Sequence, residues 1–115
     1  MDPTDYSIPE NWDRIYILDA AARPVRVFDF RVHSKWACTT GKQYKLRDTL
    51  PEHGVEVTTY FSGWASLRDD KPPMFWTLIR GGGHDRMFES ETWEAAQDKH
   101  RRVVEKVRRV LPRIG

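Results

Sequence analysis

Cysteine is almost absent from this chain of 115 residues, which has only Cys38. A single cysteine excludes the disulfide frameworks that stabilise many small secreted proteins. The chain also lacks an apolar run long enough to cross a bilayer, which takes about 18 residues. Its first residues, MDPTD, are acidic and polar, and a secretory signal peptide does not begin in this way. We therefore expect a cytoplasmic protein that does not enter a membrane.

The sequence is equally poor in patterns that support catalysis or hold a cofactor. The residues to consider are His33, Cys38, His53, His84 and His100, and they show none of the paired spacings of zinc sites. Cys38 follows His33 closely enough to form a thiol–imidazole pair, but a lone cysteine is more typical of a small core residue. His100 falls in an apolar helical row, where we expect a hydrogen-bonded imidazole rather than a ligand. The sequence predicts no enzyme, no metal site and no cofactor.

What the chain does contain is enough apolar material for a core. Apolar residues make up 39% of it and aromatic residues 12%, whereas disordered chains are poor in both. A chain of this length buries roughly two thirds of its unfolded-state surface. We predict a single domain over residues 1–115, in which residues 1–11, with Pro3, Pro9 and several acids, form a flexible arm.

Short runs of β-branched and aromatic residues alternate with turn residues along most of the chain. They predict strands at 14–18, 25–28, 44–47, 55–64, 74–80 and 86–88. Residues 29–40 fit both helix and strand, and we favour a short helix that ends before Gly41, because glycine suits the left-handed C-terminal position. We expect 55–64 and 74–80, joined by a polar loop at 65–73, to form the centre of the sheet. The nearly continuous apolar run at 74–80 predicts a strand covered on both faces.

Residues 91–111 give the clearest helical pattern. Thr92 is placed to cap the helix and Glu94 lies in its first turn, where the helix dipole favours an acid. An apolar row then recurs every three or four residues, and it consists of Trp93, Ala96, His100, Val103, Val107 and Val110. Pro112 ends the helix. The fold class is therefore α+β: an antiparallel sheet of about four to six strands, packed by a long C-terminal amphipathic helix, with a second short helix.

Positive charge is concentrated in this last helix. Residues 99–115 contain seven Lys or Arg and one acid, which leaves twelve bases against sixteen acids in residues 1–98. One basic stripe follows the helical spacing, and it consists of Lys99, Arg102, Lys106, Arg109 and Arg113. The stripe is either a surface for an acidic partner or a solvated helix face. The second interpretation is supported by two favourably oriented pairs, Asp98 with Arg102 and Glu105 with Arg109.

Aromatic residues on the two central strands form a second candidate surface, which consists of Tyr60, Trp64, Phe75 and Trp76. Because side chains alternate across a strand, these residues belong to one core only if both faces of the sheet are covered. We favour the core and keep an exposed binding surface as the alternative.

A glycine turn follows at 81–83, with Arg80 and Arg86 on either side. It could hold a phosphate, but no Lys-Ser/Thr follows and no long helix starts at the glycines. A turn that needs a permissive backbone explains the glycines equally well, and we favour it.

Several segments resemble a group of small proteins common in phages and prophages. GVEVTTYFSGW at 54–64 is similar to the V-S-T-x-F-L-G strand of that group, and PPMFWTLIRGG at 72–82 to its Pro-Pro loop and F-E-T-M-x-F-G-G strand. TWEAAQDKH at 92–100 is similar to its T-W-E-E-A-x-x-G-H helix start. Segment 19–25 is similar to its D-x-x-G-x-P-V turn, and WA at 36–37 to its W-A helix. The resemblance spans about residues 15–107, with Trp76 where the group has Glu and Gly83-His84 where it usually has Pro.

The resemblance implies a phage origin and assigns no enzymatic activity. We therefore expect a non-enzymatic phage accessory protein that binds a protein complex of the host or the phage, for example a host-defence complex, as anti-CRISPR proteins do. Nucleic-acid binding through the basic stripe is one alternative, and binding of a small anionic ligand such as a nucleotide at the glycine turn is another. The sequence leaves open the partner, the oligomeric state, and whether the stripe or the aromatic residues form the interface.

Overall fold

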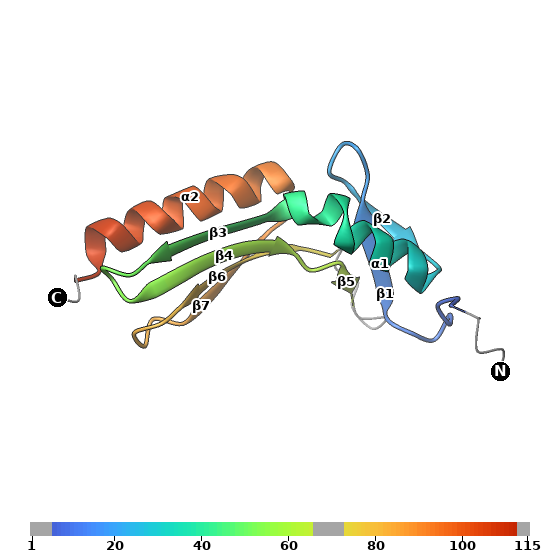
Figure 1. Ribbon diagram of the computed structural model, residues 1–115, viewed down its shortest axis with the longest axis horizontal. Helices are drawn as coiled ribbons and strands as arrows, with labels where there is room; N and C mark the ends of the chain where they lie inside the picture. Colours follow the sequence, from blue (N-terminus) through green and yellow to red (C-terminus); the bar gives the residue numbers. More distant parts are fainter. Residues whose placement is uncertain (1–5, 66–72, 113–115) are drawn as a thin grey trace. The chain divides into compact units, whose positions relative to one another are not determined.

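The computed structural model describes residues 6–65 and 73–112, which divide into two compact units (Figure 1). The first unit comprises the described residues within 1–43 and 62–73, and the second those within 44–61 and 74–115. The first contains β1 (Arg14–Leu18), β2 (Pro24–Val27), α1 (Phe30–Cys38) and β5 (Trp64–Ala65). The second contains β3 (Lys45–Leu50), β4 (Val55–Phe61), β6 (Phe75–Arg80), β7 (Arg86–Ser90) and α2 (Trp93–Val110). A 3-10 helix, η1 (Thr40–Tyr44), spans the boundary.

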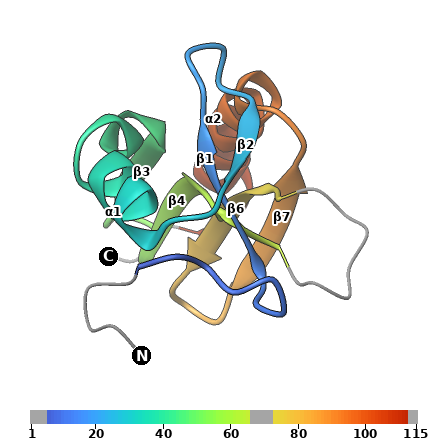
Figure 2. The same cartoon turned by 90° about the vertical axis from the view of Figure 1, so that its right-hand side faces the viewer.

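The first unit is a three-stranded antiparallel sheet in the order β2-β1-β5, with α1 (Figure 2). β1 and β2 are joined by a turn in which the Asp19 side chain accepts hydrogen bonds from the backbone amides of Ala21 and Arg23, at 2.9 Å each. These two bonds hold the turn closed, and Ala22 adopts a left-handed conformation within it, with φ of 59°. The register then places Ile15 opposite Val27, and both are buried.

The segment before β1 is part of this core. Ile8 is buried with Ile15 and Val27. Its amide donates to the carbonyl of Phe28, and the carbonyl of Tyr6 accepts from the amide of Phe30, both at 2.8 Å. The prediction of an unpaired arm over residues 1–11 is therefore wrong for Tyr6 to Ile8, and residues 1–5 lie outside the described residues.

Helix α1 confirms the helical interpretation of residues 29–40. Asp29 caps its N-terminus by accepting from the Arg31 amide. The helix ends at Cys38, before Gly41 as predicted, with Thr39 as its C-cap. Gly41 was predicted to supply a left-handed end, but it lies against the Trp36 ring instead. A Cβ at Gly41 would come within 2.9 Å of that ring, so the position has room only for glycine.

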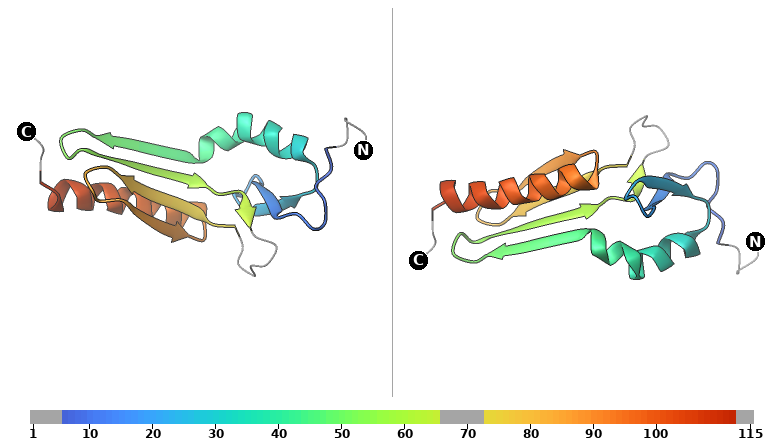
Figure 3. Two further views of the ribbon diagram at one scale, coloured as in Figure 1. Left: turned by 90° about the horizontal axis from the view of Figure 1, so that it is seen from below. Right: turned by 90° about the horizontal axis from the view of Figure 1, so that it is seen from above.

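The second unit is a four-stranded antiparallel sheet in the order β3-β4-β6-β7, with α2 on one face (Figure 3). The side chains of β4 alternate between fully buried and half-buried, as expected for a strand with one covered face. Its buried residues Val55 and Val57 pack with Leu50 of β3 and with Val103, Val104 and Val107 of α2. Each buried valine stabilises the fold by about 1.5 to 3 kcal/mol relative to an exposed one.

The α+β prediction is confirmed, including the long C-terminal helix and the second short helix. Thr92 caps α2 by accepting from the Ala95 amide, and Leu111 is its C-cap, directly before Pro112. β4 and β6 form the centre of the four-stranded sheet, as predicted. The described strands belong to two sheets, however, and the prediction that residues 1–115 form one domain stays a prediction.

Two details of the strand predictions are wrong. The predicted strand 55–64 breaks after Phe61, because Gly63 adopts a left-handed φ of 64° and Trp64 then pairs with β1. The predicted strand 74–80 is covered by α2 on one face only, since Trp76 and Leu78 stay half-buried on the other. Most of the predicted polar loop, residues 66–72, lies outside the described residues.

None of the described helices is both long and apolar enough to cross a bilayer.

Candidate binding surfaces

The basic stripe on α2 is partly neutralised at its N-terminal end. Arg102 Nε lies 2.8 Å from an Asp98 carboxylate oxygen, which confirms one of the two pairs expected from the sequence. Lys99 is half-buried, with its ammonium 5.4 Å from the centre of the Phe88 ring. These contacts leave Lys99 and Arg102 less available to a partner than the sequence implies.

The second expected pair is replaced by a different one. Glu105 lies 3.5 Å from Arg101 instead of pairing with Arg109. Arg101 also hydrogen-bonds to Asp98, and this bond raises the pKa of the Arg101 guanidinium. Within the described part of the chain, Arg109 has no ion pair, and Arg113 lies outside it. The exposed charge of the stripe is therefore concentrated toward the C-terminal end of α2.

An apolar hollow of about 140 Å³ lies at the same end of α2. Its floor and walls are apolar side chains of α2, β6, β7 and the helix end: Ile79, Phe88, Val103, Val107, Val110 and Leu111. His84, Arg86 and Lys106 complete the lining, and none of the described lining residues is acidic. Val110 is 59% exposed, although it belongs to the apolar row of the helix. Sequence reasoning missed this hollow, because it depends on how α2 lies over β7.

The four aromatic residues considered as a possible binding surface divide among three environments. Phe75 is fully buried against the rings of Phe61 and Trp93, which agrees with the favoured core interpretation; the alternative of an exposed surface is wrong for this residue. Trp64 belongs to the first unit, is 48% exposed, and donates a 2.8 Å hydrogen bond from its Nε1 to Asp13. Tyr60 and Trp76 lie directly opposite each other on β4 and β6.

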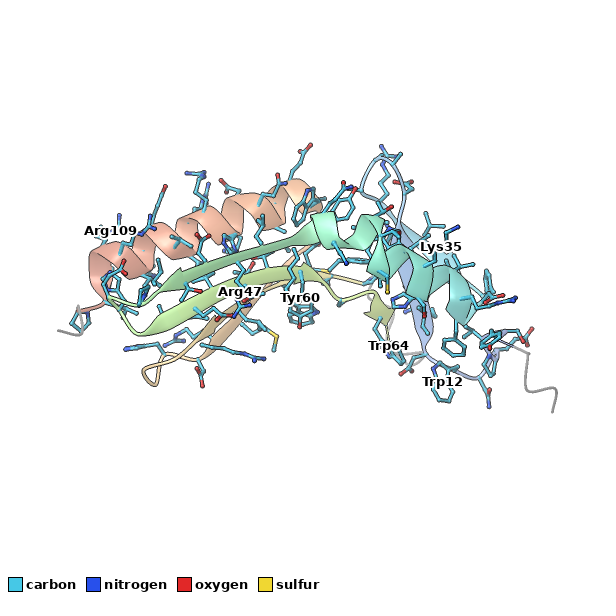
Figure 4. The ribbon with its side chains drawn as sticks, viewed as in Figure 1. Trp12, Lys35, Arg47, Tyr60, Trp64 and Arg109 are labelled. Carbon is cyan, nitrogen blue, oxygen red and sulfur yellow. The ribbon has the colours of Figure 1, made fainter. Side chains whose placement is uncertain are left out.

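Tyr60 and Trp76 are on the face of the four-stranded sheet that α2 does not cover. The register gives this face three rows across the strands, and we call it the open sheet face. The first row consists of Lys45, Tyr60, Trp76 and Glu89, the second of Arg47, Thr58, Leu78 and Met87, and the third of Thr49, Glu56 and Arg80. In Figure 4, Arg47 and Tyr60 lie on the opposite side of the sheet from α2 and Arg109.

The open sheet face carries three cations and two acids. Arg47 donates a 2.9 Å hydrogen bond to Glu56, and this bond lowers the pKa of the Glu56 carboxyl below its ordinary value. Lys45, Arg47 and Arg80 surround a shallow hollow of about 460 Å³ whose lining also includes Tyr60. Sequence reasoning singled out Arg80 beside the glycine turn but missed Lys45 and Arg47 of β3, because only the pairing of β3, β4 and β6 brings the three cations to one face. The signal for Lys45 and Arg47 was their alternation with the less exposed Leu46 and Asp48 along β3.

The glycine turn at 81–83 is explained by backbone geometry. Gly81 has a φ of 118°, and a Cβ there would lie 2.2 Å from the Gly54 carbonyl oxygen. The Gly81 amide donates to the carboxylate of Asp85 at 3.0 Å. An amide that is already bonded to a carboxylate, with that negative charge beside it, is poorly suited to bind a phosphate.

A buried polar chain connects α2 to the sheet. His100 Nε2 donates to Asp48 Oδ2 at 2.7 Å, because an ionised carboxylate can only accept. In the neutral ring, Nδ1 then accepts from the Thr59 hydroxyl at 2.8 Å, and Thr59 accepts from Thr77 at 2.8 Å. The expectation of a hydrogen-bonded imidazole at His100 is confirmed.

The chain has the atom types of a carboxylate–imidazole–hydroxyl catalytic triad. Thr59 and Thr77 are fully buried, however, and His100 is 5% exposed. A nucleophile must reach its substrate, and the Thr59 hydroxyl has no surface from which to do so. The arrangement therefore fixes the helix on the sheet and does not support catalysis.

Cys38 is exposed, so its interpretation as a small core residue is wrong. His33 contacts the Trp36 ring, with 6.5 Å between ring centroids. Among the described residues, no three His, Cys, Asp or Glu side chains come together as metal ligands. Comparison with protein-family models, curated proteins and solved structures finds no match to this chain.

Proposed function

We propose that this chain is a non-enzymatic binding protein, and that its partner is a protein segment held in the apolar hollow at the C-terminal end of α2. The hollow is the observation that supports this proposal most strongly. It combines an apolar lining with an exposed valine, Val110, and a rim that carries Arg86 and Lys106.

The chemistry of the hollow determines the kind of segment that fits. Its apolar walls accept one aliphatic or aromatic side chain, and a buried apolar anchor is the usual centre of a protein interface. The cations on its rim favour acidic residues beside that anchor. We therefore propose a partner segment in which an apolar side chain is flanked by Asp or Glu.

Selection from a random peptide library tests this proposal. We expect enrichment of peptides with an apolar residue next to acids. Val110→Asp should weaken the selected peptides at least about tenfold, because it removes an apolar wall and adds a repelling charge. Ala95→Asp is the matched control, since it adds the same side chain at an exposed position near the other end of α2.

A second matched pair separates the hollow from general charge. Lys106→Gln and Arg108→Gln each remove one exposed cation from α2, but only Lys106 lines the hollow. We expect weaker peptide binding for Lys106→Gln alone. Equal losses for both variants, or no enriched peptides, would contradict the proposal.

We propose further that the partner belongs to a host or phage complex and that binding inhibits host defence. The motif resemblance at 54–64, 72–82 and 92–100 supports this finer proposal. Phage plating on a CRISPR-immune host that expresses the chain tests it. We expect restored plaque formation with the native chain and with Ala95→Asp, and none with Val110→Asp; unchanged immunity with the native chain would contradict it.

A further inference from the structure

We propose that the open sheet face binds single-stranded nucleic acid, with bases stacked on Tyr60 and Trp76 and phosphates held by Lys45, Arg47 and Arg80. This site is on the opposite face of the sheet from α2, and it does not depend on the hollow at the helix end. The proposal rests on the register of four strands and on the charges of the residues that this register brings together.

The aromatic pair occupies the centre of the face. Tyr60 and Trp76 are cross-strand neighbours on the two central strands, and such neighbours have their Cβ atoms about 5 Å apart. Both side chains are half-buried, so part of each ring remains accessible. Aromatic rings on an open antiparallel sheet are platforms for unstacked bases, because every base offers a π face to them.

Cations lie on the β3 side of this pair and further along β6. Lys45 is directly opposite Tyr60 on β3, and Arg47 follows it one row further along the same face. Arg80 lies on β6 at the end of the third row. The hollow of about 460 Å³ that these three cations line, together with Glu56, gives room for a sugar and its phosphate beside the Tyr60 ring.

Two acids on the same face oppose this charge. Glu89 is opposite Trp76 on β7, and Glu56 accepts the hydrogen bond from Arg47. Since Arg47 lowers the pKa of Glu56, that carboxylate stays ionised at neutral pH and competes with a phosphate for Arg47. The structure therefore implies modest affinity, with Glu56 as a residue that limits it.

The same features favour a single strand over a duplex. A duplex keeps its bases stacked on one another, so the aromatic pair cannot reach their faces. A partner protein would find a small apolar centre, formed by the two half-buried rings with Leu78 and Met87, and a charged residue in every row. Single-stranded nucleic acid is the ligand that uses both the rings and the cations.

Fluorescence anisotropy with a labelled, mixed-sequence single-stranded oligonucleotide tests the proposal, with DNA and RNA as separate probes. Three phosphate contacts predict a roughly 20-fold loss of affinity between about 50 and about 200 mM salt. Tyr60→Ala should weaken binding about tenfold, as expected for the loss of one stacked base. Trp76→Phe keeps a stacking ring and should retain most of the affinity.

Three charge variants make the test specific to this face. Arg80→Gln should weaken binding and reduce the salt dependence, whereas Arg109→Gln on α2 removes the same charge elsewhere and should change the affinity little. Glu56→Gln should tighten binding about threefold or more, because it frees Arg47 and removes a repelling charge. A variant that gains affinity cannot be explained by misfolding.

Several results would overturn the proposal. Absence of oligonucleotide binding at low salt is one, and equal affinity for duplex and single strand is another. A loss with Arg109→Gln but not with Arg80→Gln would move the site to α2. Val110→Asp, the variant expected to weaken peptide binding, should bind the oligonucleotide normally. Failure of the peptide site is therefore distinguishable from failure of the nucleic-acid site.

Discussion

Removing the Thr59 hydroxyl should destabilise the second unit more than the small size of this group suggests. Thr59 links His100 to Thr77 through two buried hydrogen bonds of 2.8 Å. Thr59→Val keeps the shape of the side chain, but it leaves His100 Nδ1 and the Thr77 hydroxyl buried without this partner. Each such loss costs about 1 to 3 kcal/mol. We therefore expect a loss of about 2 to 6 kcal/mol, from a total stability on the order of 5 to 15 kcal/mol.

Urea denaturation, followed by circular dichroism and by tryptophan fluorescence, measures this loss. Thr58→Val is the matched control, since Thr58 is the next residue on β4 but lies on the open sheet face. Its substitution should change the stability by about 0.5 kcal/mol or less.

A triple variant, Thr59→Val with Thr77→Val and His100→Leu, removes the buried polar groups together. It should be more stable than Thr59→Val alone, because no buried donor or acceptor is left without a partner. The reasoning is refuted if Thr59→Val is as stable as the Thr58→Val control, or if the three substitutions destabilise additively.

Three further predictions concern local features. Titration by NMR should give the Glu56 carboxyl a pKa below its ordinary value. The stabilisation that ionised Glu56 provides is then present at neutral pH and is lost as the pH falls through that lowered pKa. Arg47→Gln should raise the pKa of Glu56 back toward its ordinary value. Gly81→Ala should lower the melting temperature more than Gly83→Ala, because a Cβ at Gly81 meets a backbone carbonyl at 2.2 Å while Gly83 has open space, and equal effects would refute this. Thr92→Ala should cost about 1 kcal/mol in urea denaturation through loss of the helix cap, and a cost near zero would show that the cap is not needed.

The C-terminal helix could be predicted from the sequence because its signals are local. A cap residue, an apolar row and a final proline all lie within one continuous segment, and the structure places α2 at 93–110. The central strands were predictable for the same reason, since β-branched and aromatic residues are dense there. Even the cap at Thr92 follows from local chemistry alone.

The parts that could not be predicted depend on contacts between distant segments. Trp64 does not continue β4, because it pairs with Ile15 of β1. The sequence around Trp64 contains no signal that indicates this partner. Phe75 and Trp76 are adjacent and both aromatic, yet the register buries the first and leaves the second on the open sheet face. A shift of one residue would exchange them, so register decides which aromatic residue can bind.

The candidate surfaces show the same limit. The basic stripe was visible in the sequence, but the Arg101–Asp98 contact and the position of Lys99 over Phe88 depend on side-chain geometry. The apolar hollow needs α2 and β7 side by side, so no single segment contains its pattern.

Mapping the surface that a selected peptide contacts would test the central claim most directly. Amide chemical shifts of the chain are measured by NMR while an acidic, apolar peptide from the library selection is added. We predict that the largest shifts occur around the hollow, at Ile79, Phe88 and residues 103–111. Shifts confined to the first unit, or to the open sheet face, would contradict the claim that the chain binds its partner through the C-terminal end of α2.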